Sequence, residues 1–259
     1  MAQLARSTPF ALILPALLAT ALSALAPTPA QAGGMVPLAA AAISGSGVVA
    51  TESRTVADFQ ALSLQASVDL KIRQGDRESI EVRAENNLLP LLETVVETGA
   101  KGRALVVRWK RGESIRTSKG VIVVVTVVKL ESIAIEGAGD VLVEGLTTPI
   151  LSLTIAGSGD AQLKGLRTDE LTVRVAGSGD VVAAGAASRV RISIAGSGDV
   201  STTALAADEV NVSIAGSGDA AVQANKHLTA SVAGSGEIVY VGSPTIKKSV
   251  IGSGSVRQR

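Results

Sequence analysis

The chain lacks cysteine altogether among its 259 residues. Neither a disulfide nor a lipid-modified cysteine can therefore form, even in an oxidising compartment. Aromatic residues are almost absent as well, with two Phe, one Trp and one Tyr. The fold must be stabilised by aliphatic packing and backbone hydrogen bonds, and a binding site built on aromatic platforms is disfavoured.

The chain also has little net charge and a single histidine. Lys and Arg total 24 and Asp and Glu total 23, so the formal charge is +1. This balance provides no electrostatic attraction to nucleic acid or to an anionic membrane surface, and we expect neither partner. Because His227 occurs only once, no repeated base accompanies the serines of the repeat described below, which disfavours nucleophilic catalysis.

Residues 1–32 have the pattern of a secretory signal peptide. Arg6 precedes an apolar stretch over 10–25, and the small-residue sequence Ala30-Gln31-Ala32 follows it. The apolar stretch contains Pro15 and is shorter than the ~20 apolar residues of a membrane-spanning helix. We therefore expect cleavage after Ala32, no transmembrane segment in the mature chain, and a periplasmic, outer-surface or secreted protein.

The rest of the chain divides into four stretches of different character. Residues 33–50 are rich in Gly, Ala and Ser and are expected to form a flexible linker. Residues 51–118 are more charged and alternate apolar with polar residues, which predicts half-buried strands. Residues 119–243 carry a repeat and open with the apolar run 121–128, which we interpret as a strand buried on both faces. In 244–259 we expect a C-terminal cap, with Lys247 and Ser249 at apolar positions of the repeat.

The repeat is a Gly-x-Gly corner that occurs seven times, and an aspartate directly follows five of its copies. The first glycines are residues 137, 157, 177, 196, 216, 234 and 252, so the steps are 18 to 20 residues long. A fixed period of this length indicates stacked identical units. We predict an all-β fold, a right-handed parallel β-helix (β-solenoid) with about 20-residue coils, a β-rich N-terminal portion and capped ends.

The alternation of side chains within one coil predicts which residues form its interior. Leu151, Leu153 and Ile155 should point inwards, and unbroken alternation would point both corner glycines inwards and the serine and aspartate outwards. A second glycine follows each early corner and marks another bend, as at Gly165. The predicted structural corners are Gly137, Gly139, Gly157, Gly159, Gly177, Gly179, Gly196, Gly198, Gly216, Gly218, Gly234 and Gly236.

The stacked aspartates are the main candidate for a functional site. Carboxylates one coil apart would repel by ~1 kcal/mol per pair at a protein surface, so an interaction must offset this. One hypothesis is that each aspartate accepts backbone N–H bonds at its own bend. The alternatives are a divalent cation such as calcium held between coils and a set of carboxylates with raised pKa values. The candidate metal ligands are Asp140, Asp160, Asp180, Asp199 and Asp219.

A second candidate is the outward face of the strand that precedes each corner. It presents small side chains in columns, against which a glycan, another protein or a second copy could lie, or which are simply solvated. The members are Ala156, Ala176, Ala195, Ala215, Ala233 and Thr154, Arg174, Ser193, Ser213, Ser231. Arg174, Arg189 and Arg191 near the aspartates raise the alternative of a polysaccharide-active enzyme, but the repeat is too regular for the irregular cleft of such enzymes.

Several segments together resemble a bacterial family called putative auto-transporter adhesin, head GIN domain. The resemblance covers about residues 55–241 and rests on the segments 59–64, 68–75, 79–82, 105–107 and the repeats typified by 155–160. It implies an exported β-helical protein with an adhesin-like role, and it implies no catalytic residues.

The sequence thus predicts an exported, non-enzymatic, adhesin-like binding or structural module of the cell envelope. We expect no cofactor other than calcium in the hypothesis above. The expected partners are an unidentified glycan or protein and a second copy of the chain in a homo-oligomer. The alternatives are a polysaccharide-active β-helix enzyme and a calcium-stabilised repeat scaffold.

Overall fold

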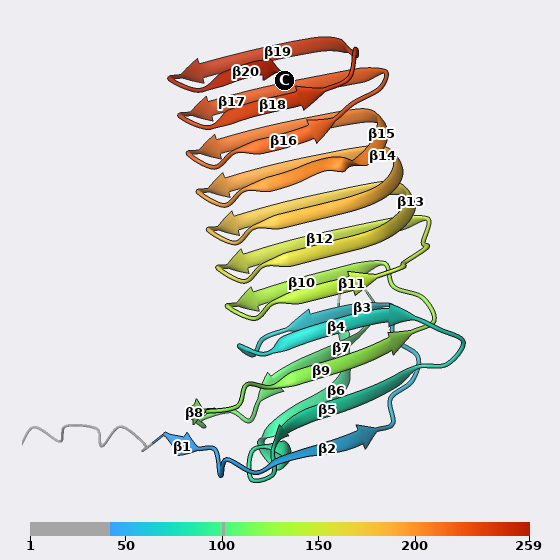
Figure 1. Ribbon diagram of the computed structural model, residues 1–259, viewed down its shortest axis with the longest axis vertical. Helices are drawn as coiled ribbons and strands as arrows, with labels where there is room; N and C mark the ends of the chain where they lie inside the picture. The colour runs from blue at the N-terminus through green and yellow to red at the C-terminus, as the bar shows by residue number, and fades with distance from the viewer. Residues whose placement is uncertain (1–41, 100–101) are drawn as a thin grey trace, which may run out of the picture. The chain divides into compact units, whose positions relative to one another are not determined.

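A computed structural model describes residues 42–99 and 102–259, and the expected signal peptide lies outside these residues. The described chain is all-β apart from the 3-10 turn η1 (Leu89–Leu91). No helix among the described residues is long and apolar enough to span a bilayer. The strands stack coil upon coil, as Figure 1 shows, which confirms the predicted β-solenoid with coils of about 20 residues.

Each coil has two strands, which are joined by a Gly-x-Gly corner from Gly137 onward, and the two strands contribute to two faces of the stack. The first face, called the a-face, contains the strands that precede the corners, and its neighbours pair in parallel. They are β7 (Gly102–Trp109), β3 (Ala61–Leu64), β10 (Ser132–Gly137), β12 (Ile150–Gly157), the second halves of β13 (Ala161–Gly177), β14 (Val181–Gly196) and β15 (Val200–Gly216), β17 (His227–Gly234) and β19 (Thr245–Gly252).

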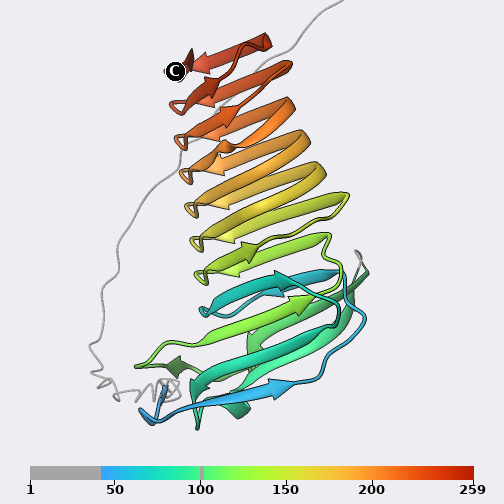
Figure 2. The ribbon, with the colours of Figure 1, turned by 45° about the vertical axis from the view of Figure 1, so that its right-hand side comes forward.

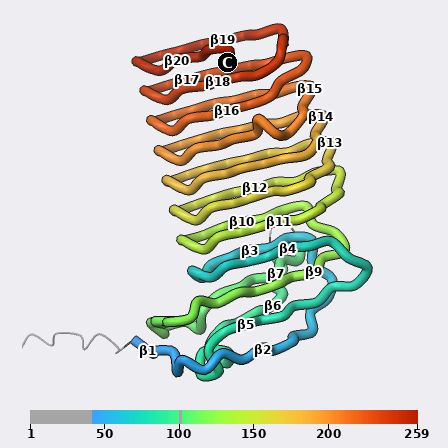
Figure 3. The backbone as a smooth tube through the Cα atoms, in the orientation of Figure 1, coloured from blue at the N-terminus to red at the C-terminus, as the bar shows by residue number. Residues whose placement is uncertain are grey.

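The second face, called the b-face, contains the strands that follow the corners, again in parallel register. They are β9 (Ile122–Val127), β4 (Asp69–Gln74), β11 (Val141–Glu144), the first halves of β13, β14 and β15, β16 (Ala220–Gln223), β18 (Glu237–Val241) and β20 (Ser255–Gln258). The tube in Figure 3 makes the step from one coil to the next easy to follow.

Aliphatic side chains from the two faces fill the interior, as the alternation predicted. Ile155 pairs with Val175, which pairs with Ile194, and each is at most 1% exposed. The register repeats from coil to coil, so identical positions stack directly above one another. Because this packing uses branched aliphatic residues together with alanines such as Ala183 and Ala230, the middle of the stack needs no aromatic side chain.

The strands β13, β14 and β15 continue through the second bend without interruption. Gly165 adopts a φ of +67° there, in the left-handed region that glycine favours. The pairing register shifts between Leu163 and Leu166, so the difference between a 20-residue and a 19-residue step is absorbed at this side of the coil. This confirms the role predicted for the second glycine.

The N-terminal part is a mixed sheet in which sequence order and spatial order differ. The coil formed by β3 and β4 lies between the coil of β7 and β9 and that of β10 and β11, so the chain passes over it between β9 and β10. Antiparallel strands then continue both faces, as Figure 2 shows: β5 (Ser79–Glu85) and β2 (Val49–Arg54) on the b-face, and β6 (Leu92–Gly99) on the a-face.

Three local expectations are changed by the structure. Of the expected linker 33–50, residues 43–44 form β1, which pairs with β8 (Ile115–Arg116), and β2 begins at Val49. The run 121–128 is not buried on both faces, because alternate residues of β9 are half-buried and Val128 is 40% exposed. Residues 245–258 form a further coil. In it, Lys248 pairs with the inward-facing Ala230 of the preceding coil, so Lys248, and not Lys247 or Ser249, takes the apolar position of the repeat.

A buried carboxylate connects two loops of the N-terminal mixed sheet by hydrogen bonds. Glu85 at the end of β5 is 0% exposed and accepts the Thr117 hydroxyl at 2.7 Å, the Ser118 hydroxyl at 2.9 Å and the Gly47 N–H at 2.8 Å. These bonds, led by that of Thr117, lower the pKa of Glu85 from its usual 4.5 to about 2, although burial opposes the shift. Glu85 therefore joins the β1–β2 connection to the loop after β8.

We expect the hydrogen bonds of Glu85 to make the free energy of unfolding depend on pH. Since the folded-state pKa of Glu85 is depressed, its contribution is fully present above pH 4.5 and is lost as pH falls from 4.5 toward 2. Glu85→Gln should lower the urea midpoint at neutral pH, because its amide cannot accept these bonds at both positions. The difference in urea midpoint between the wild type and Glu85→Gln should become smaller below pH 4.5. A difference in midpoint that stays constant down to low pH would contradict the role given to the charge of Glu85.

Candidate functional site

The Gly-x-Gly corners form one edge of the stack, at the left of Figure 1, and their glycines are required by contact with the preceding coil. A Cβ added to Gly177 would lie 2.1 Å from the carbonyl oxygen of Gly157, and one added to Gly179 would lie 2.2 Å from that of Gly159. Gly177 also has a φ of +139°. The expectation that both glycines point into the interior is therefore wrong for the first, which is partly exposed, whereas Gly179 is buried.

The aspartates that follow the corners form a ladder of hydrogen bonds from coil to coil. The Oδ1 atom of each carboxylate accepts the backbone N–H of the equivalent residue in the next coil. The donor–acceptor distances are 3.1 Å for Asp160 to Asp140, 2.9 Å for Asp180 to Asp160, 2.9 Å for Asp199 to Asp180, 2.8 Å for Asp219 to Asp199 and 2.7 Å for Glu237 to Asp219. Each carboxylate thus connects two coils.

This ladder explains why the carboxylates can be stacked. The N–H of the residue after each aspartate donates to an aspartate carbonyl of the next coil, as Ala161 does to Asp180 at 2.9 Å. The carboxylate supplies the complementary acceptor for the N–H of that aspartate, so it substitutes for a backbone carbonyl at the bend. The prediction of backbone N–H donors is confirmed, but the expected location was wrong, because the donor belongs to the neighbouring coil.

The ladder ends at Glu237, whose side chain makes a different set of contacts. It accepts the Arg257 Nε–H at 2.6 Å and the Ser255 hydroxyl at 2.9 Å. The ion pair with Arg257, followed by the Ser255 bond, lowers the pKa of Glu237. The last coil is therefore attached through an arginine in place of an aspartate.

No group of three or more His, Cys, Asp or Glu side chains in the described part of the chain is arranged to hold a metal ion. In the ladder, Oδ1 of each carboxylate already accepts a backbone N–H, and all five aspartates are exposed. The calcium hypothesis therefore remains a prediction of the sequence, and the geometry gives the aspartates a structural role that requires no ion.

The arginines considered for catalysis form no ion pair with the aspartates of the ladder, although Arg174 and Arg191 line one small pocket on the a-face. Arg189 and Arg191 both pair with Glu170 on the a-face and not with any aspartate of the ladder. His227 is exposed at the start of β17, as expected for a surface residue. The corner serines, typified by Ser178, are exposed. Among the described residues, the only carboxylates paired with these arginines are thus outside the aspartate ladder.

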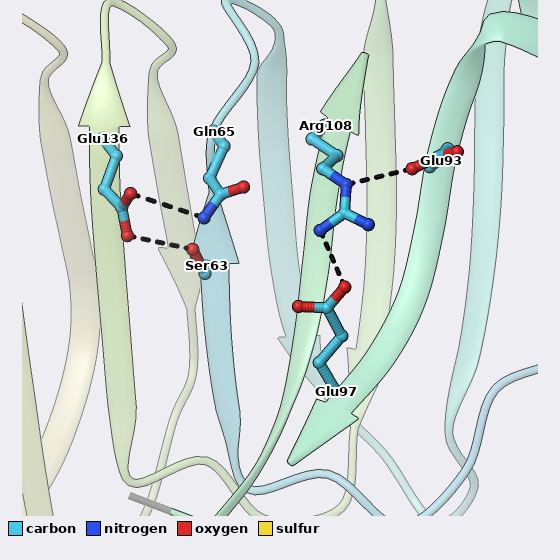
Figure 4. A network of polar contacts seen from close by, with 6 residues as sticks. All are labelled: Ser63, Gln65, Glu93, Glu97, Arg108 and Glu136. Atoms are coloured by element: carbon cyan, nitrogen blue, oxygen red, sulfur yellow. Dashed lines mark hydrogen bonds and ion pairs between the residues drawn. The ribbon is translucent and has the colours of Figure 1, made fainter. Parts of the chain in front are cut away.

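The a-face changes character along the stack. Near its N-terminal end it is charged: Figure 4 shows Arg108 of β7 between Glu93 and Glu97 of β6, at 2.9 and 2.7 Å. It also shows Glu136 of β10 near Ser63 of β3 and near Gln65, the residue that follows β3. The two glutamates raise the pKa of Arg108. From β12 onward, the column that contains Gln65 and Glu136 consists of alanine up to Ala233.

We call the region from β12 to β17 the alanine face. It comprises the outward columns Ala156, Ala176, Ala195, Ala215, Ala233 and Thr154, Arg174, Ser193, Ser213, Ser231. All five alanines are exposed, and the register stacks them one above another. The sequence predicted this surface correctly, but it did not single out Glu85, because this residue does not belong to the repeat.

Solved structures of similar proteins share this fold. A putative adhesin from Bacteroides fragilis is 27% identical, with a TM-score of 0.76 over 84% of this chain and 100% of the other. A protein from Parabacteroides distasonis described as a putative lipid binding protein is 26% identical, with a TM-score of 0.71 over 84% and 99%. A putative adhesin from Parabacteroides merdae is 25% identical, with a TM-score of 0.65 over 84% and 98%.

A search of curated proteins found no match. The sequence profile of one family matches residues 58–244, which is more than half of the chain, and these residues include most of the repeat and the mixed sheet except β2. The resemblance inferred from the motifs is therefore confirmed: the chain belongs to the family described as putative auto-transporter adhesin, head GIN domain.

Proposed function

We propose that the protein is an exported, non-enzymatic binding or structural module of the cell envelope, and that its contact surface is the alanine face. The observation that carries this proposal is the column of exposed alanines, held in register over five successive coils. Small side chains on a rigid sheet leave a flat surface that an extended glycan or a protein can approach closely. The adhesin names of the relatives support the same reading.

The contacts of the charged side chains within 42–99 and 102–259 favour a binding role over catalysis. The ladder engages the aspartates, and Arg189 and Arg191 pair with Glu170. General acid and base catalysis on a sugar needs two carboxylates on opposite sides of the bond to be broken. Carboxylates stacked in one column on one edge do not provide this arrangement.

A pair of charge substitutions tests the contact surface. Ser193→Glu with Ser213→Glu places two carboxylates on adjacent coils of the alanine face, where both side chains are exposed. The ligands are immobilised glycans and extracellular matrix proteins that the wild-type protein binds. We expect the affinity of the variant for these ligands to fall about tenfold or more, because the ligand can no longer approach closely and the new carboxylates would have to be desolvated. Surface plasmon resonance against such a panel measures it.

The control places the same charge on the other face. Gln162→Glu with Gln223→Glu lies on the b-face, and it should bind like the wild type. Equal losses in both variants would argue against the alanine face. Release of reducing ends from a glycan by the wild type, lost in Asp160→Asn and Asp180→Asn, would instead favour the polysaccharide-active enzyme.

Location and oligomeric state form part of the same proposal. The expected signal peptide and the family name support export to the periplasm, outer surface or medium. Fractionation of cells followed by native mass measurement would place the protein and show whether copies associate. Retention of the full-length chain in the cytoplasm would contradict the proposal.

A further inference from the structure

A pocket of about 580 Å³ opens where the mixed sheet meets the first coils, away from both the corners and the alanine face. Three connections form its walls: the segment 56–60 before β3, the turn 77–78 between β4 and β5, and residues 128–129 after β9. A volume of this size is within the range of small-molecule sites.

One wall of the pocket is held in a fixed shape by polar contacts. Asp58 has a φ of +60°, which is uncommon for a residue other than glycine. Its N–H donates to Glu78 at 2.6 Å, and its carboxylate accepts from Arg103 at 3.2 Å. Both acids of the pocket are thereby engaged in contacts within its wall.

Two cations of the pocket have no such partner. Arg77 and Lys129 line it, and neither forms an ion pair with a carboxylate of the described residues. They come from separate connections, so they can approach one anionic group from two sides. An arginine and a lysine together suit an oxyanion, which accepts several charge-assisted hydrogen bonds.

Apart from Gln60, the remaining lining is apolar. Val56 is partly buried against the core, Phe59 is 1% exposed and Val128 is 40% exposed. Phe59 is also one of only two phenylalanines in the chain. A ligand with an apolar stem would cover the exposed part of Val128, which otherwise faces water.

We propose that this pocket binds a small carboxylate amphiphile of the fatty-acid type. Arg77 and Lys129 hold the carboxylate, and the apolar stem lies along Val56 and Val128 toward Phe59. The site is separate from the alanine face and goes beyond the function proposed above, so either can fail without the other.

Calorimetric titration of the full chain with octanoate tests the site, with octanol and acetate as probes that lack the charge or the stem. We expect saturable octanoate binding and at least about tenfold weaker binding of octanol and acetate. Octyl phosphate distinguishes a phosphate head group from a carboxylate and should bind more weakly. Octanol binding as tightly as octanoate, tighter binding of octyl phosphate, or no saturable octanoate binding would overturn the proposal.

Substitutions connect the binding to the two cations. Arg77→Ala and Lys129→Ala should each weaken octanoate about tenfold, whereas Arg77→Lys and Lys129→Arg should retain most of the affinity. Lys164→Ala is the matched control, because it removes an exposed cation of β13 that is not part of the pocket. Undiminished binding by the Arg77→Ala/Lys129→Ala variant would refute the site, as would equal weakening by Lys164→Ala.

Discussion

Gly177→Ala is expected to lower the free energy of unfolding by about 3 kcal/mol or more. The new methyl group would lie 2.1 Å from the carbonyl oxygen of Gly157, which is backbone and cannot turn aside. Its φ of +139° is also a conformation that residues with a side chain rarely adopt. Steric overlap and backbone strain therefore act together, and relief would require the two coils to move apart.

Gly165→Ala provides the comparison within the same long strand. Gly165 has a φ of +67°, but the nearest atom to an added Cβ is 3.7 Å away, at Gly145. We expect a loss of only about 1 kcal/mol, from the left-handed backbone alone. Urea denaturation of both variants measures the two values. Equal losses would show that contact between coils does not determine the use of glycine at the corner.

Replacing three successive aspartates should separate their hydrogen bonds from their charges. Asp160→Ala, Asp180→Ala and Asp199→Ala combined leave the N–H groups of the next coils without their acceptors, at 2.9, 2.9 and 2.8 Å in the native protein. At about 1 kcal/mol for each bond, we expect a combined loss of about 3 kcal/mol. The corresponding triple Asn variant keeps the accepting oxygen and removes the repulsion, so its stability should equal or exceed that of the wild type.

The same proteins distinguish a structural ladder from a calcium scaffold. If the ladder needs only its oxygen acceptors, the thermal unfolding midpoint of each protein, wild type or triple Asn variant, should be the same in EDTA as in millimolar calcium. A calcium scaffold would show a midpoint several degrees higher with the ion, and the triple Asn variant would lose that increase. Such a result would restore the metal hypothesis for the aspartates.

The repeat made the solenoid predictable, since its period and alternation reflect stacking directly. Ile155 and its equivalents occupy the interior as the alternation required, because a period of two allows only one choice of face. The order of the first coils was not predictable. The insertion of β3 and β4 between later strands depends on long-range pairing, which leaves no periodic trace in the sequence.

The inward position of Lys248 could have been read from the sequence, because the last step is 18 residues and Lys248 follows the inward-facing Ala230 by that number. Assigning Lys247 and Ser249 to this column was an error of one residue, which exchanges the faces of a strand. The donor to Asp180, in contrast, could not be identified from the sequence, since a carboxylate at a bend can serve its own turn or the adjacent coil. The relative height of neighbouring coils decides which N–H the carboxylate accepts. In the structure it places the backbone nitrogen of Asp199 2.9 Å from Asp180 Oδ1.

Amide hydrogen exchange in Asp180→Ala tests the central claim, that each aspartate joins its own coil to the next. The Asp199 N–H loses its acceptor in this variant, whereas the N–H of residue 180 still donates to Asp160. We predict that exchange at Asp199 accelerates by about tenfold or more while exchange at residue 180 and within 177–179 is unchanged. Unchanged protection at Asp199, with faster exchange within 177–179, would show that the carboxylate serves its own bend and would contradict the ladder.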